Sequence, residues 1–136
     1  MKKFKIEKDS VQETLMIPLM GRVIAQKKFP NLINDPTAEE IIKKIDYDFS
    51  SQEKKMTSLF GVYGALEVSQ REYDLEWEIN DYLKSNPKAS VVNLGCGLDD
   101  LFNRVNNGKC RGFNIDFEDV ITARNELLPP LENEKI

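Results

Sequence analysis

The sequence predicts an α/β protein in which a helical amino-terminal region precedes the first β-α-β-α of a Rossmann-like fold. Residues 11–85 carry apolar side chains at helical spacing, interrupted by prolines and capping residues. Residues 90–94 form a short β-branched run followed by a glycine turn, and residues 112–116 read as a second strand that ends in an acid, which is typical of parallel strands joined by helices. We therefore expect a helical lid region over residues 1–88 and the start of the sheet domain over residues 89–136.

Two helices are expected in the first part of the lid region. The first runs from about Pro18 to Lys27, because proline is tolerated only in a first helical turn. Residues 30–36 then read as a loop. Thr37 and Glu40 have the spacing of a capping box, which predicts a second helix over about 38–45.

Two further helices complete the lid region. A pair of serines predicts the start of a helix over about 50–60. Because Gly61 and Gly64 weaken a helix locally, we place the start of the longest helix after them, over about 65–85. Asn86-Pro87 ends it, since the residue before a proline disfavours helical geometry.

The last third of the sequence predicts strands that alternate with helices. Ser90–Leu94 reads as a buried strand that ends in a glycine turn, and residues 112–116 as a second strand. Helices are expected over 99–105 and 118–128. No helix or strand is predicted in the polar tail, residues 131–136.

Composition excludes several classes of function. The chain has 136 residues, a net charge of −4 and no histidine, so Ser-His-Asp triads, Cys-His pairs and histidine-bound metals are excluded. No basic stripe predicts a nucleic-acid partner, and no apolar run approaches the ~20 residues that cross a bilayer. Two cysteines, Cys96 and Cys110, form no disulfide framework, and we expect a cytoplasmic protein without membrane or metal.

One group of residues has the spacing of a nucleotide-cofactor site. Gly95 and Gly97 follow the first strand and would let the backbone approach a ligand closely. Asp116 lies 19 residues after Gly97, at the end of the second strand, where its carboxylate could hold both hydroxyls of a ribose. The alternative is a structural glycine turn that binds nothing.

Asp100 bears on which cofactor this would be. It occupies the position of the third small residue in the dinucleotide fingerprint, where a carboxylate would repel a pyrophosphate. S-adenosylmethionine (SAM) has no phosphate and a positive sulfonium, so SAM is favoured over NAD or FAD.

Several segments resemble the leucine carboxyl methyltransferase family, and within it the bacterial branch of tetracenomycin-type polyketide O-methyltransferases. Val91–Asp99 is similar to the family's glycine loop. Residues 114–121, followed by Arg124 and 127–129, are similar to its second-strand segment, and residues 14–22 and 34–36 to its amino-terminal part. The resemblance covers about residues 12–130, which is the amino-terminal half of a class I methyltransferase.

The resemblance implies one further cofactor ligand, Arg71, on the helix before the first strand. In the family an arginine at this place binds the methionine carboxylate of SAM, and a guanidinium matches a carboxylate well. The alternative is a solvated helix arginine. The chain departs from the family at Asp100-Leu101 and at Glu118, and family members are about twice as long.

The function implied is SAM-dependent methyl transfer to a carboxylate or hydroxyl of a small molecule or a peptide end. Two alternatives are a non-catalytic cofactor-binding or interaction remnant and a nicotinamide-dependent oxidoreductase, which Asp100 opposes. Two parallel strands supply only one wall of a site, so we predict that this chain alone is not a competent methyltransferase. They also leave an apolar edge at Val91, Val92 and Leu94, from which we expect self-association.

Overall fold

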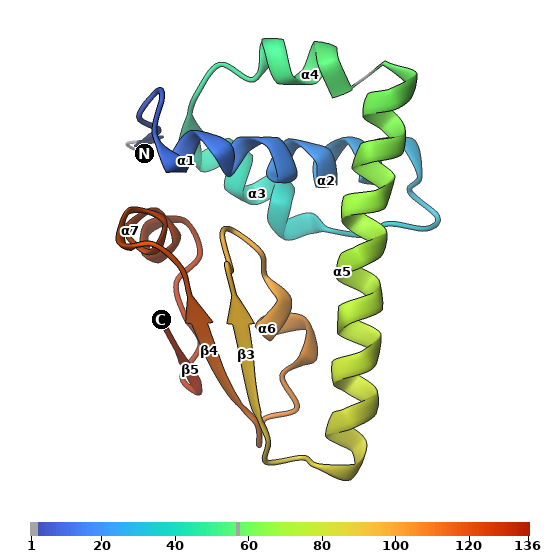
Figure 1. Cartoon of the computed structure of the whole chain (residues 1–136), viewed down its shortest axis with the longest axis vertical. Coiled ribbons are helices and arrows are strands. Elements are labelled where there is room, and N and C mark those ends of the chain that lie inside the picture. Colours follow the sequence, from blue (N-terminus) through green and yellow to red (C-terminus); the bar gives the residue numbers. More distant parts are fainter. Residues whose placement is uncertain (1–2, 57) are drawn as a thin grey trace. The chain divides into compact units, whose positions relative to one another are not determined.

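A computed structural model describes residues 3–56 and 58–136 of the chain (Figure 1). The chain divides into two compact units, residues 1–71 and 72–136. The division falls inside the long helix α5, Leu59–Ser85, whereas the sequence suggested a boundary between residues 88 and 89. That boundary stays a prediction.

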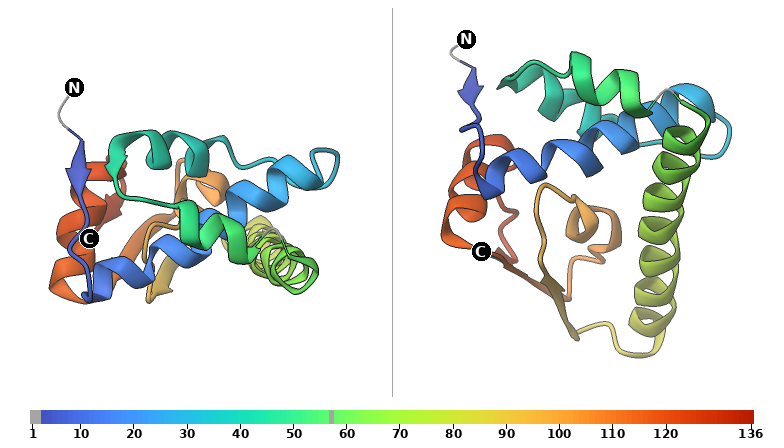
Figure 2. Two further views of the ribbon diagram at one scale, coloured as in Figure 1. Left: turned by 90° about the horizontal axis from the view of Figure 1, so that it is seen from above. Right: turned by 45° about the horizontal axis from the view of Figure 1, so that its top comes forward.

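The first unit is built mainly from helices. It contains α1 (Val11–Thr14), α2 (Met16–Lys28), α3 (Pro36–Lys44), α4 (Ser50–Met56) and the start of α5. Two short strands, β1 (Phe4–Lys5) and β2 (Ile45–Asp46), pair in parallel. The central helix α2 packs against α3 and α4 (Figure 2), and it is buried at Met16 and at every residue from Leu19 to Ala25.

The start of α3 corrects the capping-box prediction. Asp35, not Thr37, caps this helix, because its Oδ1 accepts a hydrogen bond from the amide of Ala38 at 2.9 Å. Pro36 then occupies the first turn, where its missing N–H costs nothing. Asp35 also pairs with the buried Arg22, whose Nη1 lies 3.2 Å from Asp35 Oδ2, so this ion pair supports the fold of the first unit.

The start of α5 is also earlier than predicted. The helix begins at Leu59 and runs through Gly61 and Gly64, while α4 ends at Met56. Ser58 explains the earlier start: its hydroxyl accepts a hydrogen bond from the Gly61 amide (3.2 Å), and its carbonyl accepts one from the Val62 amide (2.9 Å). The two glycines cost the helix about 2 kcal/mol, and such a cap offsets about half of that. The predicted end at Ser85 is confirmed.

The second unit follows α5 with a parallel sheet. Its elements are β3 (Ser90–Leu94), α6 (Leu101–Val105), β4 (Arg111–Ile115), α7 (Glu118–Leu127) and β5 (Glu134–Lys135). The strands are parallel in the order β3-β4-β5, with Val92 opposite Phe113 (Figure 1). The α/β class and both predicted strands are confirmed, and the predicted helices shift only at their ends. β5 lies in the polar tail, where no strand was predicted.

The two faces of this sheet have different surroundings. Leu101, Phe102 and Val105 of α6 form a core with Leu83 of α5 and with Cys110, and Val91 of β3 packs against it. Phe102 lies directly over Gly112 of β4. On the other face Val92 is 51% exposed, Leu94 74% and Ile115 52%. The prediction that β3 is buried is therefore wrong: alternate side chains face opposite ways, and only one set is covered.

Candidate functional site

The glycine loop after β3 has the backbone geometry that its sequence predicted. Gly95 has a φ of +67° and Gly97 a φ of +49°, values that side-chain-bearing residues rarely adopt. The Gly95 amide donates to the Ile115 carbonyl at 2.8 Å, so the loop begins beside the last residue of β4. This places the loop at the carboxyl ends of two neighbouring parallel strands, where open α/β sheets bind ligands.

Asp116 lies against this loop. It follows β4 directly, and its Oδ2 accepts a hydrogen bond from the Gly97 amide at 2.8 Å. Its Oδ1 accepts one from the Phe117 amide, also at 2.8 Å. A carboxylate has about four lone-pair sites, so each oxygen retains acceptor capacity for a ligand hydroxyl. The structure thus brings together Gly97 and Asp116, and their role as cofactor ligands stays a prediction.

Arg124 holds the glycine loop by hydrogen bonds, a role that the sequence did not predict. Its side chain is 2% exposed on α7. Nη1 donates to the carbonyl oxygens of Gly97 (3.0 Å) and Asp99 (2.7 Å), so one guanidinium holds two points of the loop. The spacing of buried Val120, Ala123 and Leu127 on α7 could have identified it, because Arg124 falls within that apolar stripe.

Glu134 on β5 completes this support. Its Oε1 lies 3.5 Å from Arg124 Nη2, and the carboxylate also accepts hydrogen bonds from the Leu131 amide (2.9 Å) and the Asn114 side chain. The Glu134 side chain is 6% exposed. A buried carboxylate needs this number of partners because its desolvation is costly. The short strand β5 is therefore linked to the glycine loop through a buried ion pair.

Arg104 of α6 ties the acidic part of the loop to α5. Its guanidinium lies 3.1 Å from Asp99 Oδ1, 3.1 Å from Glu76 Oε2 and 3.9 Å from Glu72 Oε2. Three carboxylates surround one cation, so the neighbourhood keeps a negative balance. This electrostatic environment favours a cationic ligand over an anionic one.

Asp100 adds to that negative balance. It is 6% exposed and stands just before α6, with no side-chain bond to the helix amides, and its Oδ2 accepts a hydrogen bond from Asn103 Nδ2 at 3.3 Å. A helix of five residues also has little dipole to offer a phosphate. The loop therefore fits a ligand without phosphate groups better than a dinucleotide.

Cys96, between the two glycines, fills space inside the loop. It is 2% exposed and makes no disulfide. Burial raises the pKa of its thiol above the ordinary value, and the nearby Asp116 carboxylate raises it further, while Arg124 acts in the opposite direction. A thiol that stays protonated is a poor nucleophile.

Arg71, the fourth predicted ligand, lies exposed on α5 as the last residue of the first unit. The glycine loop and Asp116 belong to the second unit, so the role of Arg71 stays a prediction. Within residues 3–56 and 58–136, no cluster of three or more histidine, cysteine or acidic side chains is arranged to hold a metal. None of the helices in these ranges has the length and apolarity needed to span a membrane.

Comparison with known proteins assigns a family to this arrangement. The sequence model of the leucine carboxyl methyltransferase family matches residues 16–135. The chain is 32% identical over 120 residues to the tetracenomycin polyketide synthesis O-methyltransferase TcmP of Streptomyces glaucescens. That match covers 88% of this chain and 42% of the relative, so the chain spans less than half of the relative's length. No solved structure matches the chain.

Proposed function

Because this chain belongs to the leucine carboxyl methyltransferase family, we propose that it holds the SAM-binding part of an O-methyltransferase with a Rossmann-like fold. The observation that carries the proposal is the hydrogen bond between the Gly97 amide and Asp116 Oδ2. It joins a glycine turn to an acid at the carboxyl ends of adjacent parallel strands, the usual place for a nucleotide ribose.

Each predicted residue has a distinct task in this proposal. Gly95 and Gly97 let the backbone approach the cofactor, and Asp116 accepts hydrogen bonds from the ribose hydroxyls. Arg71 binds the carboxylate of the cofactor's methionine portion with its two-pronged guanidinium. Arg124 touches no ligand and holds the loop carbonyls in place.

Bound SAM supplies a methyl group activated by a positive sulfonium. The protein contributes chiefly by positioning the two reactants, which does not require histidine. We propose as acceptor a carboxylate or hydroxyl of a small molecule or of a peptide end. A carboxylate acceptor is already a nucleophile at neutral pH and needs no general base, in keeping with a chain that has none of the usual histidine bases.

Free, buried Cys96 and Cys110 agree with a reducing compartment, and on that ground we propose a cytoplasmic location.

A second candidate is a cofactor-binding or interaction module without turnover. It would hold its ligand through the same hydrogen bond between the Gly97 amide and Asp116 Oδ2. Binding and turnover can be measured separately, so the two candidates are distinguishable. A nicotinamide-dependent oxidoreductase is disfavoured by the buried carboxylate of Asp100.

Titration calorimetry with SAM, S-adenosylhomocysteine and NAD tests the proposal. We expect the first two to bind and NAD not to bind. Asp116→Ala should weaken SAM binding by about 1.5–3 kcal/mol, the range for hydrogen bonds to a charged group. Glu118→Ala is the matched control, because it removes the same charge from an exposed position two residues away and should leave the affinity unchanged. Equal affinities of wild type and Asp116→Ala, or preferential binding of NAD, would contradict the proposal.

A further inference from the structure

Three polar side-chain atoms close to the glycine loop are buried without a hydrogen-bond partner among the described residues. They are Nδ2 of Asn93 on β3, Oδ1 of Asn114 on β4 and Nε of Arg124 on α7. Asn114 is 4% exposed and the Arg124 side chain 2%, so bulk solvent does not reach these two groups. An unpaired buried polar group is costly, and native proteins have few of them, so each one requires an explanation.

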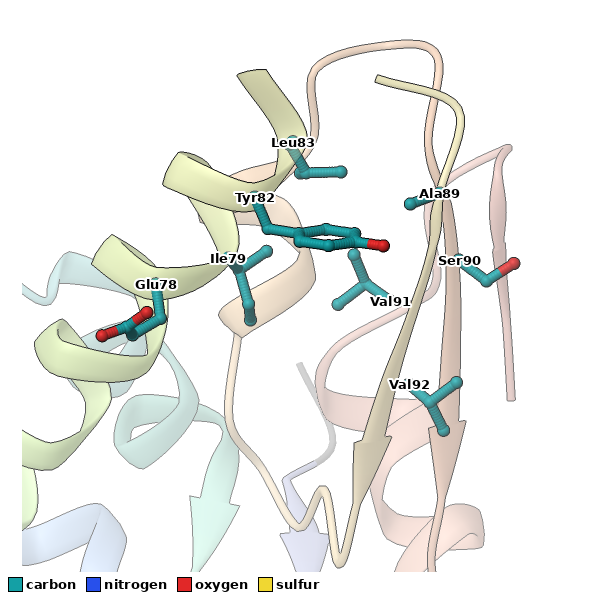
Figure 3. Close-up of a pocket in the computed structure, with 8 residues that line it drawn as sticks. All are labelled: Glu78, Ile79, Tyr82, Leu83, Ala89, Ser90, Val91 and Val92. Atoms are coloured by element: carbon teal, nitrogen blue, oxygen red, sulfur yellow. The ribbon is translucent and has the colours of Figure 1, made fainter. Parts of the chain in front are cut away.

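Asn93 and Asn114 are neighbours on the covered face of the sheet. Figure 3 shows Val91 directed towards Ile79 of α5 and Val92 directed away from it. Asn93 follows Val91 by two residues, so its side chain faces the same side as that of Val91. Asn93 and Asn114 are opposite each other in the parallel register of β3 and β4. The unpaired amino group of one amide therefore lies beside the unpaired carbonyl oxygen of the other.

The guanidinium of Arg124 meets the Asn114 amide at Glu134. Nη2 of Arg124 lies 3.5 Å from Glu134 Oε1, and the same oxygen accepts a hydrogen bond from Asn114 Nδ2. A carboxylate only accepts hydrogen bonds, so the Asn114 amide presents its amino group to Glu134 and its Oδ1 remains unpaired. The loop carbonyls occupy Nη1 of Arg124, which leaves Nε. All three unpaired atoms thus belong to side chains that adjoin one another.

We propose that these side chains bind one buried water molecule, which accepts hydrogen bonds from Asn93 Nδ2 and Arg124 Nε and donates one to Asn114 Oδ1. Internal waters typically make about three hydrogen bonds to buried polar groups, and here each bond uses an atom without another partner. Water fits this set because it both accepts and donates. An ammonium ion only donates and a chloride ion only accepts, so either would leave part of the set unpaired.

The water joins the sheet to the glycine loop. β3 and β4 contribute Asn93 and Asn114, and Arg124 extends the connection to the carbonyl oxygens of Gly97 (3.0 Å) and Asp99 (2.7 Å). With a partner at Nε as well, the guanidinium cannot turn away from these carbonyls. The water therefore helps to hold the loop in one conformation without touching a ligand. Both the binding of water and the order of the loop belong to the unliganded chain and do not require SAM to bind.

Nuclear magnetic resonance of the wild-type chain detects the water directly. The side-chain amide protons of Asn93 should show cross-relaxation with water of opposite sign in the laboratory and rotating frames, which identifies a long-lived bound water. The matched control is Asn133, whose Nδ2 donates to Asn106 Oδ1 and to the Cys110 carbonyl, each at 2.9 Å. Its amide should show no such signal. Absence of the signal at Asn93 would overturn the proposal and indicate a direct hydrogen bond to Asn114.

Replacement of Asn93 tests the effect of the water on the loop. Asn93→Leu removes the amide and should abolish the water signal at the Nε proton of Arg124. The Gly97 amide should then exchange with solvent roughly tenfold faster, because a loop that loses such a constraint opens more often. The control is the amide of Ala89, which donates to the Asn86 carbonyl at 3.0 Å at the other end of β3 and should exchange at its wild-type rate.

Asn93→Thr is the second variant, because its β-branched side chain suits a strand and its hydroxyl can still donate to the water. It should keep both the water signal at Arg124 and the slow exchange of the Gly97 amide. Circular dichroism checks that both variants keep their fold, and the wild-type measurement stands even if Asn93→Leu does not fold. Unchanged exchange of Gly97 in a folded Asn93→Leu, or equal acceleration at Gly97 and Ala89, would overturn the role of the water in holding the loop.

Discussion

Asp116 is oriented before any ligand reaches it. The amides of Gly97 and Phe117 hold one oxygen each, both at 2.8 Å, so the carboxylate cannot rotate freely. Binding a ribose then requires little additional ordering of this side chain, which lowers the entropic cost of binding. Pre-orientation by backbone amides therefore suits Asp116 to a ligand with two adjacent hydroxyls.

At Arg71 the chemistry of the ligand itself provides a test. S-adenosylhomocysteine has the carboxylate that Arg71 is proposed to bind, and methylthioadenosine lacks it. Arg71→Lys should weaken the first ligand by roughly tenfold, since a point charge cannot replace a two-pronged guanidinium. Affinity for methylthioadenosine should be unchanged in the same calorimetric experiment. Equal losses for both ligands would exclude Arg71 from the carboxylate site.

Cys96 should make the protein less stable at alkaline pH. Burial raises the pKa of this thiol in the folded state, so at high pH the unfolded chain releases the proton more readily. The contribution of the protonated thiol to stability should therefore be fully present below the ordinary thiol pKa. The free energy of unfolding should fall as the pH rises past that value. Urea denaturation at a series of pH values measures this decrease. Cys96→Ala should show a smaller decrease, and identical slopes would contradict the prediction.

At this scale the sequence predicted residues that act through spacing and missed residues that act through burial. Gly97 and Asp116 were recognisable because strand, glycine turn and acid follow one another in a fixed order. The residue type of Arg124 does not distinguish it from a surface arginine. Its position in an apolar stripe was the only indication of burial. Thr37 is a good capping residue by type, but Asp35 caps this helix instead, and Pro36 begins its first turn.

Among the secondary-structure elements, α7 and β5 depend on each other through Arg124 and Glu134. Arg124→Leu should cost about 3–5 kcal/mol of folding free energy, because it leaves a buried carboxylate without its cation. The double variant Arg124→Leu/Glu134→Leu should cost less than the sum of the two single variants. Chemical denaturation of all four proteins completes this cycle. Strictly additive losses would mean that the ion pair contributes nothing.

The contact between α6 and β4 depends on a glycine. A Cβ atom at Gly112 would lie 2.5 Å from Cγ of Phe102, and a ring atom so near the backbone cannot easily move aside. Gly112→Ala should therefore destabilise the second unit by about 1–3 kcal/mol through overpacking. Gly64→Ala is the control, because that exposed helical position has no atom within 4 Å and should gain about 0.5–1 kcal/mol. A neutral Gly112→Ala would show that Phe102 has room to shift.

The elements themselves were predictable to different degrees. β3 follows from a β-branched run that ends at a glycine turn and β4 from a short segment that ends at an acid, and Pro87 and Pro129 bound their neighbouring helices. β5 has two residues, too few for any periodicity, and it forms because Gly112 and Phe113 offer it a paired register. The start of α5 was predicted too late, because two glycines argued against a helix there. In the structure the hydroxyl of Ser58 caps the helix before both glycines.

On the scale of the whole molecule, we predict that the purified 136-residue chain does not turn over SAM. Its parallel sheet has three strands, and ligands of such sheets bind where strands on both sides form a crevice. Radiolabelled methyl transfer to a carboxylate or hydroxyl acceptor should stay at background. A positive control is the full-length tetracenomycin relative, assayed under the same conditions. Steady turnover by the chain would contradict the prediction.

The strand order β3-β4-β5 has a consequence for synthesis on the ribosome. Each strand lies beside the one made just before it, so every pairing in this sheet joins segments that leave the ribosome in succession. Each parallel pairing nevertheless forms slowly, because the helical connection between the two strands must close before they can pair. The unit from residue 72 onward can still assemble strand by strand as it emerges. β3 is the first strand of this sheet to emerge, so its edge towards β4 stays unpaired until residues 111–115 have also left the ribosome.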